Sequence, residues 1–550
     1  MREISVLIGG KAGDGINQAG ILLARLFSNM GYFVYMYFDY PSLIRGGHNF
    51  ALIRASEKKI SAHRLRIDYI IAINQDTVDF HKSKLRDQNN IIYDSDAINS
   101  SGQGLPLSKI IKEEGAKPIM RNSILMGAFA RAIGIDYELL EGVIKKNISK
   151  ELNLNLKLSA RGYKSAKELL GLTALKKKSL PVLTGNEVFG LGLISAGLEA
   201  YVAYPMTPSS NILHFLASAA DNFNLKVVHP ESEIGVILMA LGFSYKGRRV
   251  AVGTSGGGFC LMTEALSMAG MAELPLVIIV AQRAGPSTGI PTYTAQCDLH
   301  FVLSAGHGEF PRFVVAPGDS EEAYYWSNAA LNISWKYQIP SIILSDKVLS
   351  EGAFSFDRES SGNSSREEAV LWKNEGAYKR YLNTDSGISP LAFAPNRGAF
   401  IKVNSYEHDE YGITTEDPKE IMPMYEKRLR KEKYLAQELI KYDAVKVYGN
   451  KKAEIALLCW GSNKGACIEV AESLGLKVIQ PVVFSPFPRE SFSDALKGVK
   501  KIIDVENNAT AQLAGLIAKF GIFPDEKILK YDGRPFTIEE LEEKVKAVIS

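Results

Sequence analysis

Short apolar runs that end at a glycine or a polar cluster recur along the chain, and each precedes a segment with the apolar spacing of a helix. The first run, ISVLIGG, leads into INQAGILLARLF, and the runs YIIAI and NIIYD follow further along. Strand, glycine turn and helix in this order form the unit of an α/β fold with a parallel sheet. The pattern predicts an α/β domain over residues 1–175.

The same alternation returns over residues 184–352, after a basic linker that reads LKKKSLPVL. The runs RRVAVGTS, LPLVIIV and IPSIILSD are apolar almost throughout, and each ends near glycine or polar residues. Continuous apolar runs of this kind are typical of buried parallel strands. We therefore expect a second α/β domain.

Residues 353–451 do not show this alternation. The Ser-rich stretch SFDRESSGNSSREE predicts a loop, and the charge-rich stretch YEKRLRKEKYLAQELIKY predicts a helix whose charges face solvent. From residue 452 the strand-like runs AEIALLCW, LKVIQPVVF and KKIIDVE appear. They predict a third, smaller α/β domain over residues 452–550, joined to the second by a linker with irregular and helical parts.

The composition agrees with this division and narrows the function. A chain of 550 residues is too long for one core, and about three domains are expected. Hydrophobic residues make up 46% and charged residues 23%, as in an ordinary globular protein, and the net charge of +3 is too small to indicate a nucleic-acid partner. No stretch resembles a signal peptide or a membrane span, so we expect a cytoplasmic protein with no membrane partner.

The four cysteines are Cys260, Cys297, Cys459 and Cys467, and no two of them form a C-x-x-C pair. This spacing argues against an iron–sulfur cluster, a zinc site or a disulfide framework held by this chain alone. A redox centre would have to come from another chain.

The opening stretch IGGKAGDG does not match the common nucleotide-binding patterns. Its glycines lack the G-x-G-x-x-G spacing, Asp39 lies too far along to bind a ribose, and no G-K-[ST] ending follows. A glycine turn between strand and helix can still bind an anionic group through backbone N–H groups. Gly13, Asp14 and Gly15 resemble the start of the metal-diphosphate motif of thiamine diphosphate enzymes, but the Asn-Asn pair of that motif is missing downstream, where YPSLIR stands. We expect that this chain does not hold that cofactor's diphosphate by itself.

A loop with two prolines, YPMTPSS, carries Thr207 after an apolar, glycine-spaced segment. Pro205 and Pro208 each fix their own φ and disfavour helix at the residue before them, so the loop is stiff. Taken alone, it is typical of a turn at the edge of a strand.

Polar residues also follow the neighbouring predicted strands. In HPESEIG, Glu233 stands at the head of an apolar helix, which fits either a simple helix-start charge or the ligand-binding edge of an open α/β sheet. In GTSGGGFC, Gly256 and Gly257 permit a ligand or subunit to approach closely, or only form a tight turn. In QRAGPSTGIPT, Arg283 ends a strand near Thr292, and arginine can bind a carboxylate through two parallel hydrogen bonds. A lone arginine after a strand is usually a surface residue. Several polar groups at the ends of successive strands favour a ligand-binding site instead.

These stretches together resemble a known family. YPMTPSS, HPESEIG, GTSGGGFCLMTEALSMAGMAELPLVI and QRAGPSTGIPT look like the α subunits of the 2-oxoacid:ferredoxin oxidoreductases, and YPSLIRGGHNFA looks like their γ subunit. The resemblance spans nearly the whole chain, in a fused γ–α order. It implies a Rossmann-like γ domain, a domain of the thiamine-diphosphate pyrimidine-binding type, and a transketolase C-terminal-like domain.

The resemblance also implies an activity, the oxidative decarboxylation of a 2-oxoacid to acyl-CoA and carbon dioxide, with coenzyme A as co-substrate and ferredoxin as electron acceptor. In this family thiamine diphosphate is shared with a β subunit that carries the magnesium and a [4Fe–4S] cluster. The implied assembly is a dimer of heterodimers, and no metal is expected on this chain.

The resemblance assigns roles to single residues. Glu233 is the catalytic glutamate that hydrogen-bonds the cofactor's aminopyrimidine ring. The implied cofactor-binding residues also include Pro208, Gly256 and Gly257, and the implied substrate-binding residues are Thr207, Arg283, Thr292 and Arg45. Arg45 falls where some members have a lysine, and arginine keeps the charge but changes the shape and the donors.

Alternative interpretations stay open for residues 407–410, for His48 and for the function of the whole chain. Residues 407–410 look like metal ligands, but adjacent side chains point in different directions, which favours a solvated turn. His48 either lines the pocket or caps a turn. For the chain as a whole, the alternatives are a thiamine-dependent decarboxylase or transketolase-like protein without electron transfer, and a nucleotide-binding regulatory module.

Overall fold

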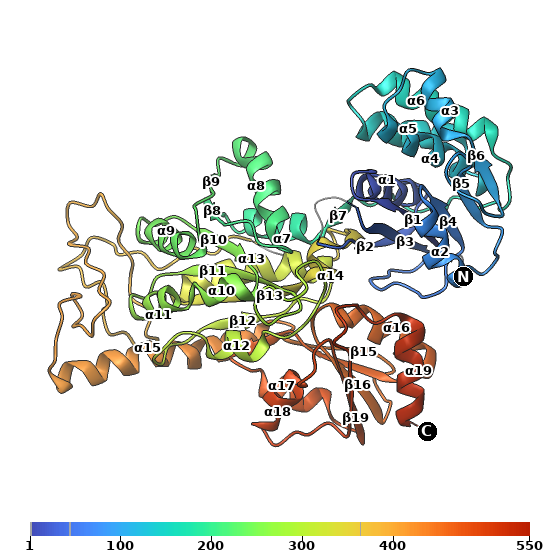
Figure 1. Cartoon of the computed structure of the whole chain (residues 1–550). Helices are drawn as coiled ribbons and strands as arrows, with labels where there is room; N and C mark the ends of the chain where they lie inside the picture. Colours follow the sequence, from blue (N-terminus) through green and yellow to red (C-terminus); the bar gives the residue numbers. More distant parts are fainter. Residues whose placement is uncertain (1–2, 43–45, 363–364, 550) are drawn as a thin grey trace. The chain divides into compact units, whose positions relative to one another are not determined.

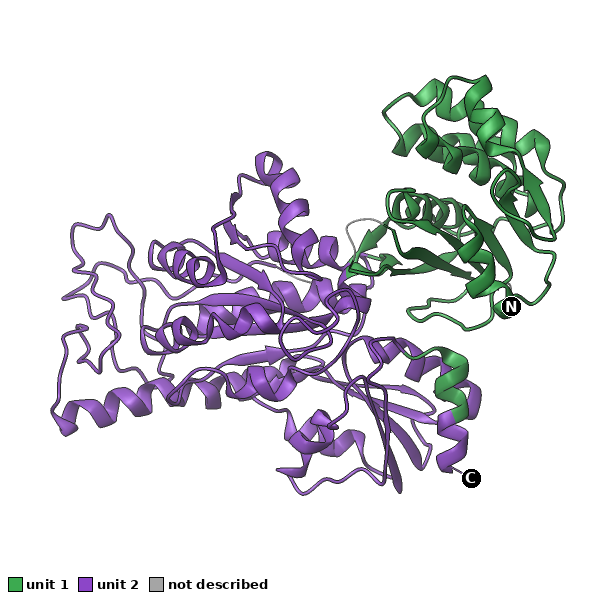
Figure 2. Ribbon diagram, viewed as in Figure 1, with its two compact units in different colours: residues 1–184, 351–357, 536–543 green, residues 185–350, 358–535, 544–550 purple. Residues whose placement is uncertain are grey.

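The structure is a computed structural model that describes residues 3–42, 46–362 and 365–549 (Figure 1). The chain forms two compact units, drawn in different colours in Figure 2. The first unit contains residues 1–184, 351–357 and 536–543, and the second contains residues 185–350, 358–535 and 544–550. Within the described ranges, no helix combines the length and the apolar character that crossing a membrane requires.

The first unit is built on an eight-stranded sheet with the order β6-β5-β4-β1-β3-β2-β14-β7. Four strands, β1, β4, β5 and β6, run parallel, whereas β3, β2, β14 and β7 pair antiparallel. The parallel sheet predicted from the opening pattern is wrong for this second half, because too few residues separate β2 from β3 for the crossover that a parallel pair needs. The strands are β1 (Glu3–Lys11), β2 (Phe33–Asp39), β3 (His48–Ser56), β4 (Tyr69–Ala72), β5 (Ile91–Asp94), β6 (Gln103–Leu105), β7 (Val182–Thr184) and β14 (Ala353–Ser355).

The first helix of this unit, α1 (Ile16–Asn29), begins directly after the glycine turn, as predicted. Gly15 precedes it with a φ of 74°, in the left-handed region that glycine enters at little cost. The apolar face of α1, including Leu23 and Phe27, is buried in the core of the unit. The other helical segments are α2 (Gln75–His81), η1 (Lys82–Lys84), α3 (Leu107–Glu113), η2 (Pro118–Met120), α4 (Arg121–Ala132), α5 (Tyr137–Asn147) and α6 (Leu152–Ser165).

The second unit contains the parallel sheet predicted for the middle of the chain. Its strand order is β18-β12-β13-β11-β10-β8-β9, and all its pairs are parallel except β18 with β12. The predicted runs RRVAVGTS, LPLVIIV and IPSIILSD are confirmed as β10, β11 and β13, whose residues are buried. The strands are β8 (Ala200–Val202), β9 (Lys226–Val228), β10 (Val250–Thr254), β11 (Leu276–Gln282), β12 (Phe313–Val315), β13 (Pro340–Asp346) and β18 (Val483–Ser485).

Helices separate these strands along the chain, as the alternating pattern predicts. They are α7 (Gly185–Ser195), α8 (Ser210–Phe223), α9 (Glu233–Tyr245), α10 (Gly256–Cys260), α11 (Thr263–Met271), α12 (Leu299–Ser304), α13 (Ser320–Tyr337) and α14 (Lys347–Glu351). Because the strands are parallel and are joined through helices, their carboxyl ends meet at one edge of the sheet.

A five-stranded sheet of order β15-β17-β16-β19-β20 also lies in the second unit. It begins at Val445, ahead of the predicted start at residue 452. Its strands are β15 (Val445–Gly449), β16 (Ile455–Cys459), β17 (Lys477–Pro481), β19 (Lys501–Glu506) and β20 (Glu526–Leu529). The helices of the same stretch are η4 (Gly461–Asn463), α16 (Lys464–Leu474), α17 (Arg489–Ala495) and α18 (Gln512–Ala518). The last helix, α19 (Ile538–Ile549), is divided between the two units after residue 543. Apolar side chains of this sheet, such as Trp460, share one core with Leu299 and Val302 of the seven-stranded sheet's domain.

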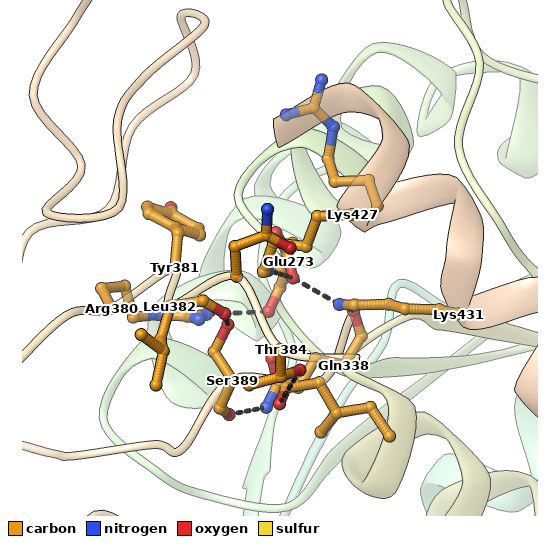
Figure 3. A network of polar contacts seen from close by, with 12 residues as sticks. Glu273, Gln338, Arg380, Tyr381, Leu382, Thr384, Ser389, Lys427 and Lys431 are labelled. Atoms are coloured by element: carbon orange, nitrogen blue, oxygen red, sulfur yellow. Dashed lines mark hydrogen bonds and ion pairs between the residues drawn. The ribbon is translucent and has the colours of Figure 1, made fainter. Parts of the chain in front are cut away.

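The predicted charge-rich helix is confirmed as α15 (Pro418–Glu438), followed by η3 (Leu439–Lys441), but one face of it does not meet solvent. Lys427 and Lys431 are buried and both form ion pairs with Glu273, which is itself buried after α11 (Figure 3). Arg380 donates to the main-chain oxygen of Glu273 over 2.8 Å. The prediction of a solvated charged face is therefore wrong here, because a buried carboxylate distant in sequence pairs with these lysines.

Candidate active site

Four neighbouring strands of the seven-stranded sheet place polar groups at one edge. In the order β11, β10, β8, β9, their carboxyl ends lead to Arg283, to glycines 256–258, to the loop with Thr207, and to Glu233 at the start of α9. The carboxyl edge of parallel strands is where ligands bind in open α/β sheets. The sequence pattern that singled out these residues is explained by this arrangement.

A cavity of about 530 Å³ opens at this edge. Its charged lining comes from Glu233, Arg283 and Asp298, and its glycine wall comes from residues 256–258. The other lining residues are Met206, Cys260, Leu261, Gly285, Pro286, Ser287, Thr288 and Phe301. The cavity is therefore mainly apolar, with one cation and two acidic groups on its surface in the described part of the chain.

Glu233 is held in a fixed position at the head of α9. Its side chain is buried, and Ser232 caps the helix by accepting a hydrogen bond from Gly235 N over 3.5 Å. A β-carbon at Gly258 would lie 2.9 Å from Glu233 Oε1 and would also collide with the Thr254 hydroxyl. Glycine at position 258 is thus required mainly by the Thr254 hydroxyl, 2.1 Å from that β-carbon, and it also lets the glutamate pack directly against the backbone.

Arg283 is fixed from the opposite side of the cavity. Its Nη1 donates to the main-chain oxygen of Thr207 over 3.0 Å, and its Nε is buried without a hydrogen-bond partner among the described residues. Burial lowers the pKa of the guanidinium, while the charge of Asp298 opposes that shift. Arg283 is therefore not the surface salt-bridge residue that a lone arginine after a strand usually is.

The structure separates the sequence-predicted residues into two groups. Glu233, Gly256, Gly257 and Arg283 line the cavity. Thr207, Pro208 and Thr292 are not among its lining residues: Thr207 and Pro208 present main-chain oxygens to Arg283 and Asn186, and the buried Thr292 hydroxyl has no partner in the described ranges. Arg45 lies outside the described residues.

Asp298 is a cavity residue that the sequence analysis did not select. Burial raises the pKa of its carboxyl group to about 6, and the nearby Cys297 thiol and Arg283 only partly offset this effect. The carboxyl group packs so closely on Gly256 that a β-carbon there would collide with it. The sequence feature that could have indicated Asp298 is its position just before α12, in the same segment as Arg283.

Two other candidate segments contribute no lining residue to this cavity among the described residues. In residues 407–410, Glu407 pairs with Arg428, Glu410 pairs with Lys379, and His408 is buried against Tyr381, so the interpretation as a solvated turn is wrong for His408. His48 begins β3, and its Nε2 lies 2.8 Å from Nε2 of His81. Among the described residues, no group of three or more His, Cys, Asp or Glu side chains could hold a metal ion.

The fold and the cavity define an α/β protein with a cavity at the carboxyl ends of parallel strands, lined by a buried glutamate and an arginine. Residues 191–427 match the family described as "Pyruvate flavodoxin/ferredoxin oxidoreductase, thiamine diP-bdg", and residues 5–165 match "Pyruvate ferredoxin/flavodoxin oxidoreductase". The 2-oxoacid:ferredoxin oxidoreductase subunit alpha of Saccharolobus solfataricus is 32% identical over 100% of this chain and 98% of its own length. The chain belongs to the α subunits of the 2-oxoacid:ferredoxin oxidoreductases.

Other similar proteins agree with this family. The 2-oxoglutarate oxidoreductase subunit KorA of Mycobacterium tuberculosis is 28% identical over 80% of this chain and 69% of its own length. A solved structure, the 2-oxoglutarate:ferredoxin oxidoreductase from Magnetococcus marinus with 2-oxoglutarate, coenzyme A and succinyl-CoA bound, matches with a TM-score of 0.89 and 28% identity over 100% of both chains. The leading interpretation of the sequence is confirmed over the non-redox and regulatory alternatives.

Proposed function

We propose that this chain supplies the substrate-binding part of the active site of a 2-oxoacid:ferredoxin oxidoreductase. The reaction converts a 2-oxoacid and coenzyme A to acyl-CoA and carbon dioxide and passes two electrons to ferredoxin. The observation that carries the proposal is the single cavity in which Glu233 and Arg283 lie on either side of glycines 256–258. The relative with 2-oxoglutarate, coenzyme A and succinyl-CoA bound supports the same substrate classes.

The cavity fits thiamine diphosphate. Glycines 256–258 remove side chains from one wall, so a ring can approach the backbone closely there. The buried hydroxyls of Thr254 and Ser255, which directly precede these glycines, have no partner in the described part of the chain. When bound, thiamine diphosphate supplies a nucleophilic carbon and an electron sink for the decarboxylation. The Glu233 carboxylate would hydrogen-bond the aminopyrimidine ring and hold the proton that moves at that ring. Pro208, Gly256 and Gly257 are the proposed neighbours of the cofactor.

Arg283 would bind the carboxylate of the 2-oxoacid. Because Nη1 is already engaged by Thr207, the edge of the guanidinium that carries Nε is the one left for a ligand. Arginine binds carboxylates most strongly through two parallel N–H groups on one edge. Thr292 is proposed to supply a hydroxyl nearby and Thr207 to shape the loop. For Arg45, which lies outside the described residues, the substrate-binding role that the resemblance implies stays a proposal.

A partner chain completes the proposed site. We assign the diphosphate, the magnesium ion and the [4Fe–4S] cluster to a β subunit, in a dimer of heterodimers that donates electrons to ferredoxin in the cytoplasm. The face of α9 beside the cavity supports a partner: Ile234 and Leu238 are 52% and 44% exposed, and Leu261 of the cavity is 51% exposed. Apolar side chains gathered in this way mark docking surfaces.

The division of the chain remains part of the proposal. Residues 1–175 would form the γ domain, 184–352 the pyrimidine-binding domain, 353–451 the linker with irregular and helical parts, and 452–550 the transketolase C-terminal-like domain. Their separate expression would test these boundaries.

The test of the function is co-expression with the neighbouring β chain, followed by an anaerobic assay of coenzyme A-dependent dye reduction. The panel contains 2-oxoglutarate, pyruvate and a branched-chain 2-oxoacid. Turnover of any of them with formation of the acyl-CoA would support the proposal. An assembled complex with its cluster and thiamine diphosphate bound that turns over none of them would contradict it.

A further inference from the structure

The wall of the cavity that carries Arg283 and Asp298 is one continuous segment, residues 283–298, which we call the cavity loop. Both of its ends line the cavity. Between them the chain forms no named strand or helix and is exposed from Gly285 to Ile290. Loops of this kind are mobile unless they are tied down by specific contacts.

Gln296 ties this loop to the five-stranded sheet. Its side chain is fully buried, and Nε2 donates to the main-chain oxygen of Trp460 over 2.7 Å. Oε1 accepts from Asn463 Nδ2 over 2.8 Å and from the main-chain N–H of Asn507 over 3.0 Å. The amide therefore joins two strand ends, since Trp460 follows β16 and Asn507 follows β19.

The backbone of Gln296 is held by the same strand end. Its N–H donates to the main-chain oxygen of Asn507 over 2.7 Å, and its carbonyl accepts from Asn508 Nδ2 over 3.0 Å. Every polar group of Gln296 thus binds the five-stranded sheet's domain. A fully buried amide needs such partners, and here all of them come from one domain.

A buried carboxylate fixes the groups that hold Gln296. Glu506 Oε2 accepts from Trp460 Nε1 over 2.9 Å and from Asn508 Nδ2 over 2.7 Å. Trp460 and Asn508 are therefore restrained on both sides of Gln296. Glu506 therefore ties together the two residues whose groups bind Gln296.

Further contacts lie on each side of Gln296. Thr294 N donates to Gly533 O over 3.0 Å, and Gln512 Nε2 donates to Cys297 O over 2.7 Å. At the cavity end, Asp298 N donates to Gln282 Oε1 over 2.9 Å. The loop is thus fixed from Thr294 to Asp298.

We propose that Gln296 is a positioning residue through which the five-stranded sheet's domain holds Arg283 and Asp298 in the cavity wall. That domain contributes no lining residue to this cavity within the described ranges, yet it sets the shape of the loop that does. The kinetic consequence rests on the proposed function, whereas the anchoring itself does not.

The test compares Gln296→Met with Gln480→Met in the co-expressed complex. Methionine keeps the volume of glutamine and removes its hydrogen bonds. Gln480 is a matched control, because it is equally buried, lies in β17 of the five-stranded sheet, and donates to Glu322 rather than to the cavity loop, over 2.9 Å. Asn463→Ala is a milder variant that removes one of the two hydrogen bonds to Oε1 and keeps the other.

Hydrogen–deuterium exchange measures how firmly the cavity loop is anchored, and it does not require an active enzyme. In Gln296→Met, we expect amides of residues 284–298 to exchange about tenfold faster or more, with peptides of β11 and β16 unchanged. Asn463→Ala should show a smaller change in the same peptides, and Gln480→Met none. Unchanged exchange of residues 284–298 in Gln296→Met would overturn the proposal.

Steady-state kinetics measure the effect of the anchoring on substrate binding. A displaced Arg283 should raise KM for the 2-oxoacid about tenfold to a hundredfold in Gln296→Met and leave KM for coenzyme A unchanged. A role in stability alone would instead lower kcat with the fraction of folded enzyme and leave both KM values unchanged, which would overturn the proposal. If the wild-type complex turns over no 2-oxoacid, the proposed function fails, and the exchange of residues 284–298 still decides the anchoring.

Discussion

Arg283 Nη1 donates a hydrogen bond to the main-chain oxygen of Thr207 over 3.0 Å. Since β10 lies between β11 and β8, this bond links the loops on either side of the strand that leads to glycines 256–258. It fixes the guanidinium and leaves its Nε without a partner in the described part of the chain. The threonine singled out by its proline-rich loop thus acts on the arginine through its backbone.

We expect substitution of Arg283 to weaken binding of the 2-oxoacid. Arg283→Lys keeps the charge but loses the planar pair of N–H groups, and Arg283→Gln loses both. Removing one partner of a buried charged hydrogen bond costs enough to lower kcat/KM for the 2-oxoacid by about a hundredfold or more in Arg283→Gln, with a smaller loss in Arg283→Lys. The measurement is steady-state dye reduction at varied 2-oxoacid.

The control for this prediction is Arg248→Gln. Arg248 is 62% exposed and pairs with Glu199, so its loss should leave both kinetic constants unchanged. Equal KM values in wild type and Arg283→Gln would contradict the assigned role.

Glu233→Gln should leave the complex assembled and remove most of its turnover. The amide keeps the shape of the side chain beside Gly258 but cannot accept and return a proton, a role that contributes about a hundredfold to ten-thousandfold to rate. Glu231→Gln, two residues earlier and exposed, serves as the matched control. Gel filtration and kcat would be measured together, and an active Glu233→Gln complex would refute the role.

The strands and the strand-end residues of the middle domain could be predicted from the sequence. A buried parallel strand needs a continuous apolar run, and a ligand site at its end needs polar groups or glycine, so Arg283 and Glu233 stand out locally. Asp298 and Gln296 do not stand out in the sequence. Asp298 packs against Gly256, and Gln296 bonds to residues at strand ends far along the chain, so neither contact is visible from neighbouring residues.

The buried lysines show the same limit more clearly. Charges spaced along a helix indicate a solvated face. No residue near Lys427 or Lys431 in the sequence indicates that they pair with a buried carboxylate. Their partner, Glu273, lies 154 residues before Lys427. Long-range pairing of this kind becomes visible only when the fold brings the two segments together.

Asp298 should make stability fall as the pH rises through about 6. Burial raises its folded pKa to about 6 from a usual value near 3.8, so the folded state takes up a proton that the unfolded state has already lost. The contribution is fully present below pH 3.8 and is lost above pH 6, by at most about 3 kcal/mol. Asp298→Asn should remove this dependence in thermal melts between pH 4 and pH 7.5.

Two outcomes decide this prediction. Asp221→Asn, at an exposed acid on α8, should melt with the same pH dependence as wild type. If Asp298→Asn also follows the wild-type curve, the carboxyl group is already ionised throughout this range, and the raised pKa is wrong.

Lys431 should give the opposite dependence, with stability that rises between about pH 7 and pH 10.5. Burial lowers its folded pKa from 10.5 to about 7, although Glu273 opposes the shift, so the unfolded chain binds a proton that the folded chain has released (Figure 3). Lys431→Met should flatten the rise in melting temperature over this window. The neighbouring Lys427, whose pKa burial also lowers, would keep part of the rise.

The control is Lys433→Met, at an exposed lysine on the same helix, which should match wild type. If melting temperature rises with pH as steeply in Lys431→Met as in wild type, Lys431 stays charged.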